Sequence, residues 1–249
     1  MIQTIKLKRY PGEIISLFFS ICLLLFFSFI VFEINIIIFA LIILFQLFYI
    51  LISQRQFIGN ALQVTEKQFI DIHGIVKDNA IRLGIKIPKV FIVQDPYLNA
   101  FTIGFLSPYT IVLTSTLVES LTKEEINFVL GHEMGHIRFG HSKILSFISP
   151  LGKGIPVISW LYGFWQRKAE FSSDRAGLFT VGEIKPAIST MLKMAVGKKL
   201  ADLIEVEEII KQIEASEDTL LSTTGESLLT HPYTMKRIKN LIEFNRFNY

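Results

Sequence analysis

The chain has 249 residues, of which 51% are apolar and only 19% are charged, and its mean hydropathy is +0.46. Ordinary soluble domains carry about 25% charged residues, so this composition excludes both a typical soluble enzyme and a disordered chain. The formal net charge is only +3, and the chain has no dense basic run with interleaved aromatic residues, so we expect no nucleic-acid partner.

The apolar residues are concentrated near the N-terminus. Between Ile14 and Ser53, Glu33 is the only charged residue. Residues 14–32 and 36–52 would reach roughly 28 and 26 Å as helices, close to the thickness of a hydrocarbon core of about 30 Å. We therefore predict a two-helix transmembrane hairpin in contact with the lipid bilayer. This membrane anchor occupies residues 1–57, and one globular domain follows over residues 58–249.

Positive charge lies on one side of the predicted hairpin. Lys6, Lys8 and Arg9 precede the first span, Arg55 and Lys67 follow the second, and the turn between the spans has no positive charge. The positive-inside rule therefore predicts a multi-pass protein of the cell membrane, with its N-terminus and globular domain facing the cytoplasm. A cleavable signal peptide is disfavoured because a second span follows at once. A hairpin buried in a soluble core is disfavoured because the segment has almost no polar face.

The globular domain is predicted to be α+β and mostly helical, with a small sheet. Residues 65–81 have helical spacing, with Thr65 and Gln68 as a capping box. Turn residues separate short β-rich segments, which are 89–94, 100–105 and 110–114. The rest of the chain from Ser115 has helical patterns, with helices expected at 122–139, 168–181, 184–196, 203–215 and 233–244.

A second apolar stretch covers residues 144–165, and prolines and glycines interrupt its middle. Each arm is too short to span a bilayer, so no transmembrane helix is predicted here. The stretch either lies on the membrane surface, with Trp160, Tyr162 and Trp165 at the level of the headgroups, or packs within the domain.

The sharpest motif is an HExxH sequence, residues 132–136, within the predicted helix 122–139. Histidines at positions i and i+4 share one helix face, with Cβ atoms roughly 5–6 Å apart, so His132 and His136 can bind one zinc ion. Glu133 would face a water molecule on the metal and can accept its proton. The alternative is an accidental pair of surface histidines.

A catalytic zinc needs a third protein ligand and an open position. Glu170 lies on the next predicted helix and can supply that ligand. Asp174, one turn later on the same face, can accept the free N–H of a zinc-binding histidine. Without the HExxH motif, a solvent-exposed face with basic neighbours would be the better interpretation of this pair.

The other histidines have weaker patterns. His231 precedes a proline at the start of the last helix, where it can stabilise an oxyanion, occupy the open zinc position, or serve as a plain helix-terminal residue. His73 and His141 have no partner at a meaningful spacing and are interpreted as surface or packing residues. Arg237 can support the site, but a surface charge is the simpler interpretation.

HExxH, then Glu-x-x-x-Asp, then the late His-Pro and Arg237-Ile238 resemble the membrane-bound zinc endopeptidases of the HtpX type, relatives of the CAAX prenyl proteases. The resemblance covers nearly the whole chain and implies a zincin-type metalloprotease domain. It also includes Asn99-Ala100-Phe101 followed by Gly104-Phe105. In that family the Asn-Ala-Phe segment lies on a strand beside the cleft, which implies that Asn99 and Ala100 pair with the substrate backbone. A plain edge strand is the alternative.

The resemblance also implies the roles of the site residues. His132, His136 and Glu170 would be the zinc ligands, Glu133 the general base, and Asp174 the acceptor that orients a histidine ligand. HtpX proteins carry two further spans between the metal helix and the third ligand, where this chain has only the stretch 144–165. The CAAX proteases have more spans still, which disfavours a role in prenyl processing.

We therefore predict a membrane-anchored zinc metalloendopeptidase with one Zn²⁺ per chain. Its partners would be polypeptide substrates, which we expect to be misfolded or membrane proteins cleaved from the cytoplasmic side. One alternative is a non-catalytic membrane adaptor with a structural zinc site, which would close all four zinc positions. A zinc-independent anchor for a protein complex is the other, and it predicts no bound metal.

Overall fold

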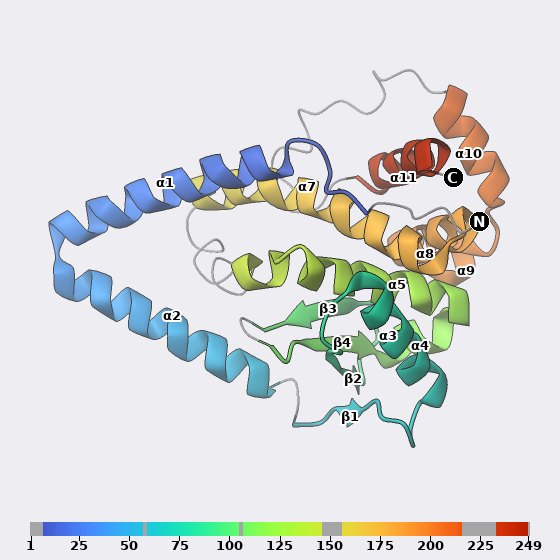
Figure 1. Ribbon diagram of the computed structural model, residues 1–249, viewed down its shortest axis with the longest axis horizontal. Coiled ribbons are helices and arrows are strands. Elements are labelled where there is room, and N and C mark those ends of the chain that lie inside the picture. The colour runs from blue at the N-terminus through green and yellow to red at the C-terminus, as the bar shows by residue number, and fades with distance from the viewer. Residues whose placement is uncertain (1–6, 57–58, 105–106, 146–155, 216–232, 249) are drawn as a thin grey trace.

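The computed structural model describes residues 7–56, 59–104, 107–145, 156–215 and 233–248 (Figure 1). Most of them form helices, with one small mixed sheet, as the α+β prediction requires. The elements in chain order are α1 (Glu13–Ile34), α2 (Ile36–Gln56), β1 (Leu62–Gln63), α3 (Ile70–Leu83), β2 (Lys89–Val93), β3 (Ala100–Ile103), β4 (Thr110–Thr114), α4 (Ser115–Ser120), α5 (Lys123–Arg138), α7 (Pro156–Val181), α8 (Ile184–Val196), α9 (Lys198–Ala201), α10 (Val206–Ala215) and α11 (Thr234–Asn248).

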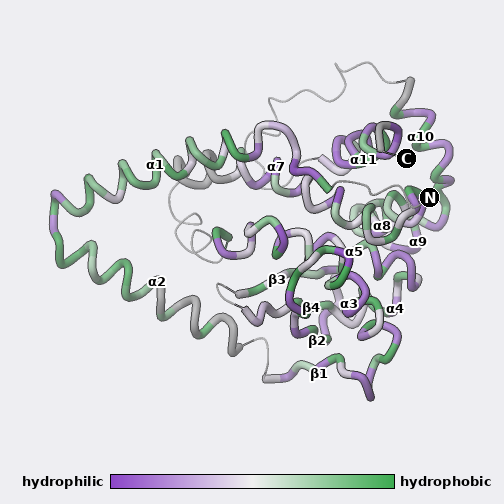
Figure 2. The backbone as a smooth tube through the Cα atoms, in the orientation of Figure 1, coloured by the Kyte–Doolittle hydropathy of each residue, from purple (hydrophilic) through white to green (hydrophobic). Residues whose placement is uncertain are grey.

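Helices α1 and α2 extend from the rest of the chain as the two arms of a V (Figure 1), and α1 is hydrophobic along most of its length (Figure 2). Asn35 joins the arms: it ends α1 in an extended conformation, and its side chain accepts hydrogen bonds from the backbone N–H groups of Ile37 and Ile38. Within the described ranges, α1 alone is long and apolar enough to span a membrane, and the apolar part of α2, Ile36–Phe45, is shorter.

The sheet has the strand order β1-β2-β4-β3. β2 and β4 are parallel, whereas β1 and β3 are antiparallel to their neighbours, and Val112 of β4 pairs with Phe91 on one side and Phe101 on the other. Strand β3 therefore forms an edge of the sheet. Helices α3 and α5 share the main hydrophobic core with the sheet, and this core includes Val76, Ala80, Ile111, Leu113, Val129, Leu130 and Met134.

Helices α5 and α7 pack unusually closely because glycines line their contact. A Cβ atom on Gly135 would lie 2.7 Å from the Cβ of Ala176, and one on Gly177 would lie 2.8 Å from the backbone oxygen of Phe128. Only a residue without a side chain fits at such positions. The two glycines therefore bring the HExxH helix against the helix that carries Glu170.

The structure corrects the boundaries of several elements that were predicted from the sequence. The helix predicted over 65–81 begins at Ile70, because Thr65 and Gln68 pair with each other through their backbones and are not a capping box. The predicted box at the next helix is present, with Thr122 and Glu125 bonding each other's backbone N–H groups. Strand β1 was not predicted, because its two residues are too few to show the alternation of apolar and polar residues that indicates a strand.

Helix α7 begins at Pro156 and not at residue 168, so the second half of the stretch 144–165 is helical. At the end of this stretch Trp165 is fully buried and packs with Leu17 and Leu24 of α1. This residue therefore packs within the molecule, against the apolar helix α1. Residues 146–155 lie outside the described ranges.

Candidate metal centre

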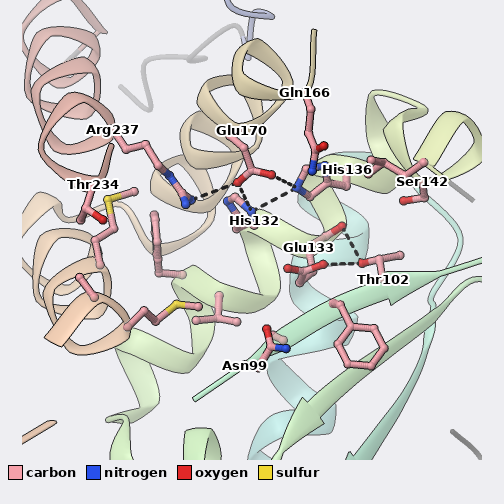
Figure 3. Close-up of a pocket in the computed structure, with 18 residues that line it drawn as sticks. Asn99, Thr102, His132, Glu133, His136, Ser142, Gln166, Glu170, Thr234 and Arg237 are labelled. Atoms are coloured by element: carbon pink, nitrogen blue, oxygen red, sulfur yellow. Dashed lines mark hydrogen bonds and ion pairs between the residues drawn. The ribbon is translucent and has the colours of Figure 1, made fainter. Parts of the chain in front are cut away.

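Three potential metal ligands converge between α5 and α7 (Figure 3). His132 and His136 occupy one face of α5, with their Nε2 atoms 3.2 Å apart. Glu170 of α7 faces both: Oε2 lies 3.5 Å from Nε2 of His132, and Oε1 lies 3.6 Å from Nε2 of His136. The three ligand atoms all lie within 4.8 Å of one another, so they can hold a single metal ion. Two imidazoles and one carboxylate are a donor set that catalytic zinc takes in proteins.

Asp174 and Arg237 form a charged pair behind His132. Oδ1 of Asp174 lies 2.9 Å from Nδ1 of His132, which directs Nε2 of the ring towards Glu170. Arg237 of α11 donates two hydrogen bonds to this carboxylate, from Nε at 2.8 Å and Nη2 at 2.6 Å, and Nη2 also lies 3.4 Å from Glu170. Helix α11 reaches this position because Ile238 and Leu241 pack into a second hydrophobic core with α8.

Burial and these neighbours determine the charge state of the site. Burial would raise the pKa of Asp174, but the charge and hydrogen bonds of Arg237, together with those of His132, lower it. Burial likewise opposes the charged form of His132, yet Asp174 and Glu170 together raise its pKa. Burial lowers the pKa of His136 well below its ordinary value, so its ring is neutral, as a metal ligand must be.

Glu133 is buried on α5 next to the ligands, and its carboxylate contacts β3. The hydroxyl of Thr102 donates a hydrogen bond to Oε2 of Glu133 at 2.7 Å, and this bond restrains the side chain. Burial raises the pKa of Glu133, although the charge of His132 and the bond from Thr102 act in the opposite direction. A carboxylate with a raised pKa is a stronger proton acceptor than an ordinary glutamate.

His136 is supported by a second histidine. Its Nδ1 lies 3.1 Å from Nδ1 of His141, and Nε2 of His141 lies 3.0 Å from Oε1 of Glu13 at the start of α1. Both His141 and Glu13 are fully buried, and burial lowers the pKa of His141. The interpretation of His141 as a residue without a partner is therefore wrong.

The three converging side chains and Glu133 line one cavity of about 400 Å³, together with residues 99–102 at the edge of the sheet. The cavity lining also includes apolar residues of α5 and α8, namely Phe128, Val129, Met191, Met194 and Ala195. A metal site, a proton acceptor and an edge strand therefore share one space, where a bound chain could present a carbonyl group to all three.

The structure brings together all but one of the site residues predicted from the sequence, namely Asn99, Ala100, Phe101, His132, Glu133, His136, Glu170 and Asp174. His231 lies outside the described residues. The interpretation of Arg237 as a surface charge is wrong, because its guanidinium bonds to Asp174. Sequence reasoning missed Thr102 and Glu13 altogether. The signal for Thr102 is its position as a polar residue of the predicted strand 100–105, directly after Phe101, whereas no local pattern marks Glu13.

Comparison with known proteins decides the family. The sequence profile of peptidase family M48 matches residues 66–155 and 145–245. The chain belongs to peptidase family M48. The predicted relationship to HtpX-type proteases is thereby confirmed, since this M48 chain is also 32% identical over 152 residues to a protease HtpX homolog of Streptococcus pyogenes serotype M5. That match covers 59% of the M48 chain and 51% of the relative.

A second relative is the plastoglobule-localized metallopeptidase 48, chloroplastic, of Arabidopsis thaliana, which is 30% identical over 210 residues. The match covers 76% of this chain and 61% of the relative, so the M48 chain spans about half to three fifths of these two relatives. The fold is similar to the crystal structure of S. mikatae Ste24p, with a TM-score of 0.52 and 16% identity. That alignment covers 94% of this chain and 67% of the other.

Proposed function

We propose that the chain is a membrane-anchored zinc metalloendopeptidase that holds one Zn²⁺ with His132, His136 and Glu170. The observation that carries this proposal is that these three donors converge in the same cavity as Glu133. A structural zinc site would surround the ion with four protein ligands. The described residues contribute three, and a proton acceptor lies beside them, which favours catalysis over the adaptor alternative.

Each side chain has a separate task in peptide-bond hydrolysis. Bound zinc supplies Lewis-acid chemistry, because it lowers the pKa of a water molecule and polarises a carbonyl group. The Glu133 carboxylate accepts the proton of the attacking water and then passes it to the leaving amine. Thr102 keeps that carboxylate in place through its 2.7 Å bond. Asp174 accepts a hydrogen bond from the Nδ1–H of His132, so that Nε2 offers its lone pair.

Residues 99–101 would bind the substrate as an added strand. β3 stands at the end of the strand order and lines the cavity, so one of its edges faces the site. An extended peptide can bond to such an edge through its backbone, which selects for unfolded chain more than for sequence. The apolar wall around Met191 and Met194 would receive substrate side chains next to the cleaved bond.

Membrane proteins are the proposed substrates, because the apolar helix begins beside the metal site. Glu13, the first residue of α1, contacts His141, which in turn contacts His136. If α1 and α2 cross the bilayer as a hairpin, the cavity lies close to the membrane surface. Residues 1–57 would then be the anchor, and residues 58–249 the protease domain on the cytoplasmic side, as the positive charges flanking the hairpin indicate.

The test compares Glu133→Gln with the matched variant Glu124→Gln, which changes an exposed glutamate on the same helix. Detergent-solubilised full-length chains are incubated with an unfolded protein and with a membrane protein, and the fragments are analysed by mass spectrometry. Glu133→Gln should bind zinc as the wild type does but cleave neither substrate, whereas Glu124→Gln should cleave both. Undiminished cleavage by Glu133→Gln would overturn the mechanism. A wild-type chain that binds zinc but cleaves nothing would support the adaptor.

A further inference from the structure

A histidine that binds a metal through Nε2 carries its proton on Nδ1, and that N–H needs an acceptor. His132 has a direct one, the carboxylate of Asp174. The Nδ1 atom of His136 instead faces another histidine nitrogen, Nδ1 of His141, at 3.1 Å. Between two such nitrogens only one can carry the proton. His136 can therefore donate only if Nδ1 of His141 is unprotonated and offers its lone pair.

Glu13 selects that tautomer of His141. Its carboxylate oxygen lies 3.0 Å from Nε2 of His141, and an ionised carboxylate only accepts hydrogen bonds. The proton of His141 is thus held on Nε2, and its Nδ1 is left as an acceptor for His136. Every bond in the series then has one direction, from His136 to His141 to Glu13. The hydroxyl of Ser173 also lies near this Nδ1, at 3.4 Å.

Glu13 is in turn held rigidly at the start of α1. Arg9 and the hydroxyl of Ser172 both donate hydrogen bonds to its carboxylate, which is fully buried. The preceding backbone is tied to α7 as well: the N–H of Tyr10 donates to the Ser172 hydroxyl at 2.7 Å, and Lys168 donates to the carbonyl of Gly12 at 3.2 Å. Figure 1 shows α1 running alongside α7 from this point. The first turn of the apolar helix is therefore fixed relative to the metal ligands.

We infer that Glu13 is a positioning residue of the metal centre, which acts through His141 to orient His136. The N-terminal helix would then complete the site in addition to anchoring the chain. This inference rests on the proposed function, because it concerns the same zinc ligands. It predicts that the loss of the carboxylate at the first residue of α1 weakens zinc binding. Partners of metal-binding histidines typically contribute about 10- to 100-fold in metal affinity or activity.

The test measures zinc affinity and not activity. Full-length wild type, Glu13→Gln, His141→Phe, the double variant and the control Glu33→Gln are purified in detergent, and the Kd for zinc is obtained by competition with a chelating dye. Glu33 is the other acidic residue of α1 and is exposed at its far end. Phenylalanine retains an aromatic ring against Trp165, whose ring centroid lies 5.7 Å from that of His141. Cobalt-substituted samples report the ligand geometry through their visible absorption.

We expect Glu13→Gln and His141→Phe each to weaken zinc binding by about 10- to 100-fold and to alter the cobalt spectrum, with Glu33→Gln unchanged. Because Glu13 acts through His141, the double variant should bind zinc about as well as His141→Phe alone.

A zinc Kd for Glu13→Gln within about twofold of the wild type, or losses that multiply in the double variant, would overturn the inference. Should His141→Phe fail to fold, the Kd and cobalt spectrum of the isosteric Glu13→Gln decide the question. A wild type without zinc affinity refutes the proposed function instead.

Discussion

Replacing Gly177 with alanine tests whether the close approach of α5 and α7 builds the metal centre. The new Cβ would lie 2.8 Å from the backbone oxygen of Phe128, well below the 3.4 Å of ordinary contact, and the Phe128 ring is equally close. A backbone atom cannot rotate away, so the helices must separate by roughly 0.6 Å. Overpacking costs about 3 kcal/mol at its upper range, and the better helix propensity of alanine offsets about 1 kcal/mol.

The net loss of about 2 kcal/mol should lower the thermal midpoint by about 4–8 °C. Zinc affinity should fall as well, because Glu170 moves with α7 away from the histidines on α5 and metal–ligand distances tolerate only about 0.2 Å. The matched control is Gly74→Ala in α3, where nothing lies within 4 Å of the new Cβ. That variant should be as stable as the wild type or up to about 1 kcal/mol more stable. Equal midpoints and equal zinc affinities for Gly177→Ala and the wild type would refute the reasoning.

Two further substitutions, and a control for the second, have calculable effects. Thr102→Val removes the bond to Glu133, so kcat/KM should fall about 10- to 100-fold with the zinc content unchanged. Because that bond lowers the Glu133 pKa, the acid limb of the pH–rate profile should move to higher pH, and an unmoved limb would contradict this role. Lys193→Met leaves the buried carboxylate of Glu125 without the ammonium 2.9 Å away, which should cost about 3–5 kcal/mol in unfolding experiments. Lys123→Met breaks an exposed pair and should cost less than about 1 kcal/mol; similar losses for both variants would be inconsistent with this explanation.

The sequence predicts those parts of the site that depend on one helix at a time. His132 and His136 share a face because they are four residues apart, and Glu170 and Asp174 do so for the same reason. His141 escapes this rule because α5 ends at Arg138 and Gly140 adopts a left-handed conformation, with φ of 77°. The helix is therefore interrupted before His141, and this histidine contacts His136 without any helical spacing to indicate it.

Contacts between segments that are far apart in the sequence could not be predicted either. Glu13 precedes His141 by 128 residues, and its pattern is only that of a charged residue before an apolar span. The polar face of α11 likewise predicts that Arg237 is exposed. In the structure, Ile238 and Leu241 pack into the second hydrophobic core, and the guanidinium of Arg237 therefore faces Asp174. In each case tertiary packing brings the partner residue into contact. A single sequence has no periodic pattern that indicates such a contact.

The measurement that tests the central claim most directly is a zinc titration of peptide-bond cleavage. The full-length chain is stripped of metal with a chelator, zinc is added back in steps, and the hydrolysis of an unfolded protein is followed at each step. If His132, His136 and Glu170 hold one catalytic ion, cleavage should vanish on stripping and return linearly, with a break at one zinc per chain. Cleavage that survives stripping, or that fails to return with zinc, would contradict the assignment of a zinc metallopeptidase.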